Sequence, residues 1–127
     1  MSQLLLDTNV IIDHLRGNPK AVAFLNGLTT SPLTSVIVVA ELFAGVREGA
    51  ERVQLERFLS ALTVLPLSDD TAIHGGLLRR QYGKSHNVGL ADALIAATTQ
   101  ASNATLVTLN AKHFPMLADV IVPYSKP

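Results

Sequence analysis

The sequence predicts an α/β fold, a three-layer α/β/α sandwich with a central parallel sheet. Two observations carry this prediction. Short runs rich in apolar and β-branched residues alternate along the chain with longer stretches whose apolar residues recur at helical spacing. Strands that alternate with helices form right-handed parallel βαβ units, which place helices on both faces of one sheet.

In the first half of the chain, each expected element is bounded by its own residue pattern. The apolar run 3–6 indicates a strand that ends at Asp7, and the helical spacing over 10–16 stops at Gly17-Asn18-Pro19. The segment 36–48 begins with β-branched residues and continues with alanine, glutamate and leucine, and we interpret it as a helix. The other elements expected in this half are a helix from Pro19, a strand over 33–35 and a helix over 50–62.

The second half of the chain repeats the alternation. Residues 63–67 are expected to form a strand, and Ser68-Asp69-Asp70-Thr71 supplies an N-cap for a helix that continues through Tyr82. A loop over 83–89 then leads to a helix over 90–101, a strand over 105–109 and a last strand over 120–122. No repeat, low-complexity stretch or linker interrupts the pattern, so residues 1–127 are predicted to form a single domain.

Composition narrows the class of protein. At 127 residues the chain can bury one hydrophobic core, and the absence of cysteine excludes disulfides, thiolate zinc sites and a cysteine nucleophile. The ten basic and ten acidic residues give a net charge of zero, so the overall charge does not favour binding to nucleic acid. A local basic patch is still compatible with this composition. There is no secretory-signal pattern and no apolar run near the ~20 residues of a membrane span, so a cytoplasmic protein is expected. With 48% apolar and 16% charged residues, an apolar surface for a partner or a second copy is also expected.

Three acidic residues stand in apolar surroundings. Asp7 directly follows the first strand, and ligands bind beyond the carboxyl ends of the strands in parallel sheets. Glu41 has apolar neighbours at helical spacing, which predicts a buried carboxylate, and Asp92 lies in the first turn of an apolar helix. Each acid alone has an ordinary structural explanation. Asp7 can cap a helix, and Glu41 can point to water. Asp92 can interact favourably with the helix dipole. One shared site at the carboxyl edge of the sheet explains all three more economically.

Such a site indicates metal-dependent phosphodiester hydrolysis. Crowded carboxylates repel one another, and a divalent cation keeps them ionised. Ligands that are all oxygen select a hard cation, so Mg²⁺ or Mn²⁺ is expected. The four histidines show no paired helical spacing typical of a zinc site. Asp7, Glu41 and Asp92 are therefore the predicted catalytic residues.

Other residues are expected to support the acids. Those that would hold the acids or a water by hydrogen bonds are Thr8, Asn9, Thr108 and Asn110. Taken alone, Asn110 is more simply a turn residue after a strand. Those that would position RNA through its phosphates are Arg47, Arg79, Arg80 and Lys84. A basic run of this kind is more often only a solvated helix end.

Four segments stand in a fixed order along nearly the whole chain. They are LLDTNVII around Asp7, VAELFAG around Glu41, LADALIAA around Asp92, and TLVTLN, which ends at Asn110 and is followed by Phe114. In this combination they resemble the PIN-domain family, specifically its VapC-like toxins. The resemblance implies a PIN-like fold and Mg²⁺- or Mn²⁺-dependent endoribonuclease activity, with Asp7, Glu41 and Asp92 at the family's three principal acidic positions.

The resemblance also implies a role and partners. It suggests the toxin of a toxin–antitoxin pair, usually a homodimer bound to a VapB-like antitoxin whose tail covers the active site. The family's fourth acidic position falls at Asn110, which argues against a tightly held second metal. We therefore expect one ion bound by Asp7 and Asp92, with Glu41 bound directly or through water. Residues expected at the dimer or antitoxin surface are Phe24, Leu25, Phe43 and Phe58.

Three other classes of protein were compared with this pattern. A PIN-fold binding module without nuclease activity is one, and Asn110 would then mark the lost activity. A phospho-accepting receiver domain fits less well, because Asp7 stands alone and no acid follows the strand around Val64 and Leu65. Haloacid-dehalogenase-type phosphatases fit less still, since Asp7-Thr8-Asn9 lacks a second aspartate.

Overall fold

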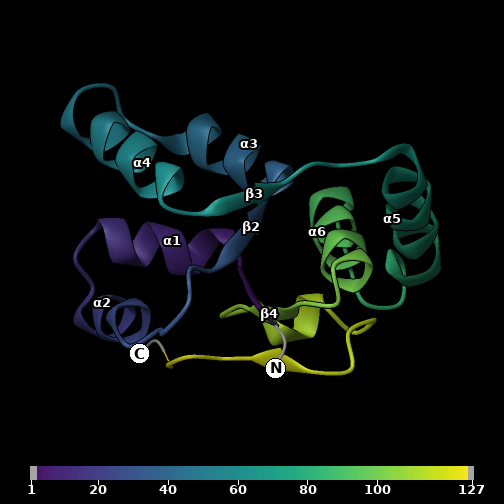
Figure 1. Ribbon diagram of the computed structural model, residues 1–127. Helices are drawn as coiled ribbons and strands as arrows, with labels where there is room; N and C mark the ends of the chain where they lie inside the picture. Colours follow the sequence, from purple (N-terminus) through teal and green to yellow (C-terminus); the bar gives the residue numbers. More distant parts are fainter. Residues whose placement is uncertain (1–2, 126–127) are drawn as a thin grey trace.

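The computed structural model describes residues 3–125 and contains an all-parallel sheet of five strands in the order β3-β2-β1-β4-β5. The strands are β1 (Leu4–Leu6), β2 (Leu33–Ser35), β3 (Thr63–Leu65), β4 (Thr105–Val107) and β5 (Val120–Ile121). The helices are α1 (Thr8–Leu15), α2 (Pro19–Asn26), α3 (Val36–Gly45), α4 (Ala50–Ser60), α5 (Asp69–Tyr82) and α6 (Leu90–Ala101), with a 3₁₀ turn, η1 (Ala111–His113). Figure 1 shows α1 and α2 on one side of the sheet and α5 and α6 on the other, which confirms the predicted three-layer sandwich.

The order of the strands reverses beside β1. The chain builds β1, β2 and β3 in one direction, then crosses over through α5 and α6 to place β4 on the other side of β1. Such a switch point leaves a crevice at the carboxyl ends of the two central strands, where ligands of parallel sheets bind. Asp7 follows β1 and Thr108 follows β4, and the Asp7 N–H donates to the carbonyl of Val107 at 2.9 Å. The topology therefore brings these two residues to the same edge.

Several helices and strands end earlier than the sequence predicts, for reasons that lie in the local backbone. The helix expected over 36–48 ends at Gly45, because Val46 adopts an extended backbone with φ −73° and ψ 142°. The strand expected over 63–67 ends at Leu65, because Pro66 has no N–H to donate to a ladder. The strands expected over 105–109 and 120–122 end earlier as well, at Val107 and Ile121.

Side-chain caps decide where two helices begin. The β-branched run after β2 becomes helical because Ser35 Oγ accepts a hydrogen bond from the N–H of Val38 at 3.1 Å. In α5 the cap is Ser68, whose Oγ accepts from the N–H of Thr71, and Asp69 and Asp70 lie in the first turn rather than at the cap position. The predicted cap segment is thus right, but its acids act through the helix dipole.

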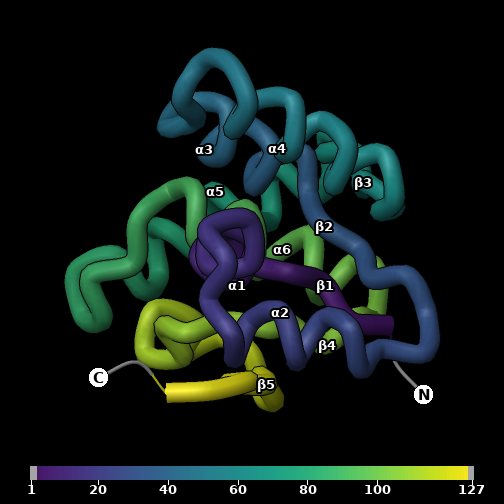
Figure 2. Tube along the Cα trace, turned by 90° about the vertical axis from the view of Figure 1, so that its left-hand side faces the viewer, coloured from purple at the N-terminus to yellow at the C-terminus, as the bar shows by residue number. Residues whose placement is uncertain are grey.

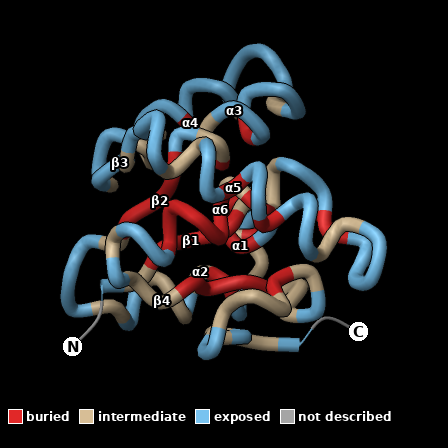
Figure 3. The backbone as a smooth tube through the Cα atoms, turned by 90° about the vertical axis from the view of Figure 1, so that its right-hand side faces the viewer, coloured by how far each residue is buried: buried red, intermediate tan, exposed pale blue. Residues whose placement is uncertain are grey.

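The core lies along β1, β4 and the helices that face them. Figure 3 shows the buried segments in the middle of the molecule, where the strands lie, and the outer helical turns exposed. The fully buried side chains of β1, α1, α6 and β4 include Leu5, Leu6, Val10, Ile11, Ile95, Leu106 and Val107. No helix within residues 3–125 has both the length and the apolar character needed to cross a membrane.

The C-terminal segment is tied to α1. The Tyr124 hydroxyl donates a hydrogen bond to Oδ2 of the buried Asp13 at 2.8 Å. Figures 1 and 2 both place α1 with α3 and α4 on one side and with α2 and the β5 segment on the other. α1 is therefore held from several directions, which fixes the helix that begins at Asp7.

Two neighbouring glycines in α5 allow a test of the contact between α5 and α6. A Cβ at Gly75 would lie 2.6 Å from Leu94 Cδ2 and 3.2 Å from Leu94 Cα, whereas a Cβ at Gly76 would meet nothing within 4 Å. Gly76→Ala should raise the free energy of unfolding by about 0.5–1 kcal/mol through helix propensity. Gly75→Ala should instead lower it by about 1–2 kcal/mol, because overpacking outweighs that gain. Urea unfolding of the two variants measures this difference. Equal stabilisation by both would show that Leu94 of α6 can move aside at no cost in free energy.

Candidate active site

Asp7 is held by hydrogen bonds from two directions. It occupies the N-cap of α1, where Oδ1 accepts from the N–H of Thr8 at 2.8 Å. Its Oδ2 accepts from the buried Thr108 hydroxyl at 2.8 Å, and Thr108 Oγ1 in turn accepts from the N–H of Asn110 at 3.0 Å. The capping explanation for Asp7 is thus correct, and the cap also fixes the carboxylate at the edge of the sheet.

Glu41 reaches the same region from α3, which packs against both α1 and α6. The Thr8 hydroxyl donates to Glu41 Oε1 at 2.7 Å, so Thr8 bonds to Asp7 through its backbone and to Glu41 through its side chain. Glu41 itself is exposed, and the predicted burial of its carboxylate is wrong. The buried face of α3 is carried by Val38 and Leu42 instead, which leaves Glu41 on the rim of the site.

Asp92 enters the site from the first turn of α6. Its Oδ2 lies 3.4 Å from Nδ1 of His113, which belongs to η1, and the two side chains are 27% and 43% exposed. His113 is the residue that the sequence analysis missed, because the histidines were tested only for zinc-like spacing. Its proximity in sequence to Asn110 and Phe114 was the available signal.

The electrostatics of the site show that the three acids share one environment. Burial raises the pKa of Asp7 above its ordinary value, against the hydrogen bonds from Thr108 and Thr8, and the charges of Asp92 and Glu41 raise it further. Burial also raises the pKa of Asp92, which His113 opposes and Glu41 reinforces. Glu41 therefore faces the other two acids closely enough to interact with both.

The donor set fits a hard divalent cation in its chemistry. The acids offer oxygen ligands, and a cation would replace mutual repulsion by attraction. Among residues 3–125, however, no three His, Cys, Asp or Glu side chains are already arranged to hold one ion. The exposed Glu41 and the half-buried Asp92 are the two acids whose side chains have room to adjust toward an ion.

The other predicted residues divide into two groups. Thr8 and Thr108 hold the acids as expected, whereas Asn9 is exposed and Asn110 contributes its backbone N–H. The four basic residues, Arg47, Arg79, Arg80 and Lys84, are all exposed. Within the described part of the chain, none of them forms an ion pair with the three acids, and Arg47 instead lies 3.8 Å from Glu51.

The family follows from comparison with known proteins. The family model described as the PIN domain matches residues 4–119. The chain belongs to the PIN-domain family. Among curated members, this PIN domain is 43% identical to Ribonuclease VapC19 of Mycobacterium tuberculosis, over 94% of the present chain and 98% of that protein. It is 40% identical to Ribonuclease VapC10 of the same organism, over 98% and 95% of the two chains.

Solved structures agree with this placement in the VapC branch of the family. A toxin–antitoxin complex from Klebsiella pneumoniae matches with a TM-score of 0.84 and 28% identity, over 98% of this chain and 100% of that one. VapBC2 from Rickettsia felis, bound to a DNA fragment from its promoter, matches with a TM-score of 0.75 and 30% identity, over 93% and 95% of the chains. The five-stranded PIN fold is therefore shared along nearly the full length.

The raised pKa values of the PIN-domain acids predict how stability depends on pH without metal. The folded state binds more protons than the unfolded chain between the ordinary aspartate pKa of 3.8 and the raised values, so stability falls as pH rises through that window. The free energy of unfolding should therefore increase as pH is lowered from about 7 to about 4.

Urea unfolding in EDTA across this range measures the effect. The Asp7→Asn/Asp92→Asn double variant lacks both carboxyl groups, so its difference from the wild type gives their contribution to the pH dependence. The free energy of unfolding should increase less on acidification in the double variant than in the wild type. The same pH dependence in both proteins would contradict the raised pKa values.

Proposed function

We propose that this VapC-family chain is a metal-dependent endoribonuclease that hydrolyses RNA phosphodiester bonds with Asp7, Glu41 and Asp92. The observation that carries the proposal is the convergence of these acids at the switch point of the sheet, where the Thr8 hydroxyl joins Glu41 to the residue after Asp7, and where the charges of Asp92 and Glu41 raise the pKa of Asp7. The reaction class is supported by the relatives named ribonuclease at 43% and 40% identity over nearly the whole chain.

Each of the three acids and the two threonines beside them has a distinct role in the proposed reaction. Asp7 and Asp92 would hold a Mg²⁺ or Mn²⁺ ion, and Glu41 would bind it directly or through water. A bound ion would supply Lewis acidity for phosphodiester hydrolysis. Thr108 and Thr8 keep the Asp7 and Glu41 oxygens in place through their hydroxyl groups. A cytoplasmic location fits an RNA substrate.

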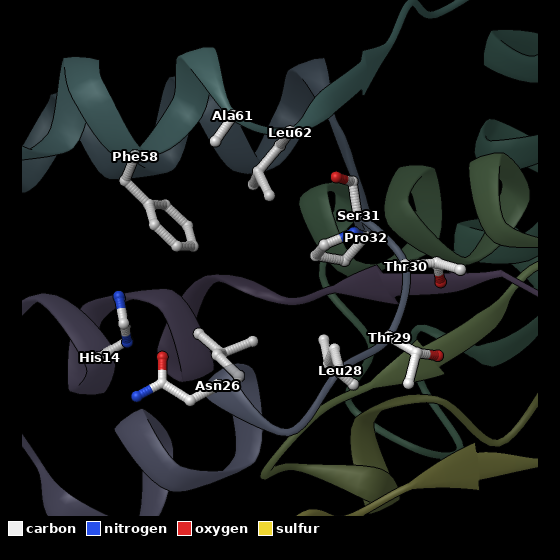
Figure 4. Close-up of a pocket in the computed structure, with 11 residues that line it drawn as sticks. His14, Asn26, Leu28, Thr29, Thr30, Ser31, Pro32, Phe58, Ala61 and Leu62 are labelled. Atoms are coloured by element: carbon white, nitrogen blue, oxygen red, sulfur yellow. The ribbon is translucent and has the colours of Figure 1, made fainter.

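We also propose that the protein is the toxin of a toxin–antitoxin pair, inhibited by a VapB-like antitoxin that lies along α1. A cavity of about 350 Å³ opens between α1, the 26–32 segment and α4. Figure 4 shows Phe58 of α4, and Leu62 just after that helix, facing His14 and Leu28 across it. Burial lowers the pKa of His14, so this wall of the cavity is neutral at physiological pH.

Two further hollows share lining residues with this cavity in turn, and we refer to the three together as the groove. His14 and Phe58 also line a neighbouring depression with Leu15, and Leu15 lines a further one of about 130 Å³ that includes Glu41. A peptide laid along the groove would bring its end to Glu41, where a basic side chain would find complementary charge. The full-length likeness to a toxin–antitoxin complex supports the pairing.

The homodimer remains a prediction. Of the residues expected at a partner surface, Phe24, Leu25 and Phe58 are half-buried against the core, and Phe43 is exposed with the Arg52 guanidinium 5.9 Å from its ring centre. Several apolar side chains are more exposed than Phe43, and those on α5 and at the start of α6 include Ile73, Leu77 and Leu90.

Cleavage of RNA by antitoxin-free protein tests the proposed nuclease. Discrete cleavage of total cellular RNA is expected with Mg²⁺ or Mn²⁺ and none with EDTA. Asp7→Asn and Asp92→Asn should each lower kcat by about 100-fold or more, because a lost metal ligand removes several kcal/mol of transition-state stabilisation. Asp69→Asn, which removes an exposed acid of α5, should cleave like the wild type.

The alternatives give different outcomes in the same assay. Folded wild-type protein that cleaves no RNA with either metal would support a PIN-fold binding module instead. Cleavage that persists in the Asp7 and Asp92 variants would show that the reaction uses other residues.

Filling the groove tests where the antitoxin lies. Thr29 is exposed and lines the cavity, so Thr29→Trp should weaken inhibition by the cognate antitoxin at least about tenfold while RNA cleavage stays unchanged. Leu77→Trp, on the exposed face of α5, is the matched control and should be inhibited normally. Equal inhibition of both variants would place the antitoxin outside the groove.

A further inference from the structure

His113 is presented to the active site by a short turn that the core anchors. Its N–H donates to the carbonyl of Asn110 at 2.9 Å, and the N–H of Phe114 donates to the carbonyl of Ala111 at 3.0 Å. Phe114 is only 2% exposed and belongs to the hydrophobic core. The backbone at His113 is therefore fixed from both sides, although its side chain is partly exposed.

The turn places His113 on an acid from another element. Its Nδ1 lies 3.4 Å from Asp92 Oδ2, and within residues 3–125 this is the one ion-pair contact that any of the three site acids makes. Thr108, earlier in the same segment, donates to Asp7 Oδ2 at 2.8 Å. One stretch of chain after β4 thus holds two acids that come from two different elements.

We propose that His113 is a positioning residue that fixes the Asp92 carboxylate for metal binding, as Thr108 fixes that of Asp7. The proposal rests on the proposed function, because it assigns His113 a task toward the ion that Asp7 and Asp92 would hold. His113 contacts Oδ2 of Asp92, so Oδ1 is the oxygen that would bind the ion. Partners of this kind orient metal-binding side chains, and their loss typically weakens metal affinity or activity by about 10- to 100-fold.

A purely structural role predicts something different. An exposed ion pair adds little to folding, so its removal should barely change stability and should leave metal binding unchanged. Positioning predicts unchanged folding together with weaker metal binding. The two roles can therefore be separated by measuring both quantities in the same variants.

The choice of variants follows from the atom that makes the contact. Because Nδ1 is the contacting nitrogen, the amide nitrogen of asparagine can occupy nearly the same position. His113→Asn keeps a donor toward Asp92, and His113→Ala removes it. His86 is a matched control, because it is exposed and its ring contacts Ser85 and Tyr82 rather than an acid.

Calorimetric titration of antitoxin-free protein with Mn²⁺ alone tests the proposal. His113→Ala should bind Mn²⁺ about 10- to 100-fold more weakly than wild type, His113→Asn should recover most of that loss, and His86→Ala should bind normally. Thermal unfolding without metal should be similar in all four proteins. In RNA cleavage at saturating Mn²⁺, His113→Ala should recover kcat more fully than it does at low Mn²⁺.

Two results would overturn the proposal: wild-type Mn²⁺ affinity in His113→Ala, or an equal loss in His113→Asn and His113→Ala. The same titration includes Asp7→Asn and Asp92→Asn, and cleavage by the wild type is measured beside it. If the wild type cleaves RNA and the aspartate variants lose Mn²⁺ but His113→Ala does not, only the role of His113 fails. If the wild type neither binds Mn²⁺ nor cleaves RNA, the proposed function itself fails.

Discussion

The Asp7 carboxylate joins three elements of the fold, and the geometry of the site depends on this junction. Its backbone N–H continues the β1–β4 ladder, one side-chain oxygen caps α1, and the other accepts the Thr108 hydroxyl. The same residue therefore ends a strand, begins a helix and fixes the loop after β4. A side chain with this many partners cannot change position without disturbing the switch point of the sheet.

The arrangement concentrates negative charge where the fold gives it little compensation. Burial and neighbouring acids raise the pKa of Asp7 and Asp92, and of these two carboxylates only that of Asp92 is contacted by His113. Partly buried carboxylates that repel one another lower the free energy of unfolding relative to apolar side chains at the same positions. A divalent cation between them replaces this repulsion by attraction. Folding stability and cation binding are therefore linked through the same two carboxyl groups.

α1 connects the two regions that we assign to function. Its N-terminus carries Asp7 and Thr8, and its C-terminal half lines the groove through His14 and Leu15. The C-terminal segment holds this helix through Tyr124 and Asp13. A ligand in the groove and an ion at the acids would thus contact opposite ends of one short, firmly held helix.

The sequence by itself determined the order of the strands and helices along the chain. It thereby placed Asp7 at the end of a strand and Asp92 in the first turn of a helix, because both positions depend on local apolar spacing and on where each apolar segment ends. The tertiary structure decided what each acid touches. Thr108 meets Asp7 from 101 residues away, and the contact of His113 with Asp92 joins η1 to α6. The exposure of Glu41 was decided in the same way, because the rotation of α3 depends on which of its faces packs against its neighbours. Helical spacing identifies a face, but only packing shows whether a residue at its margin is buried or lies on the rim of a site.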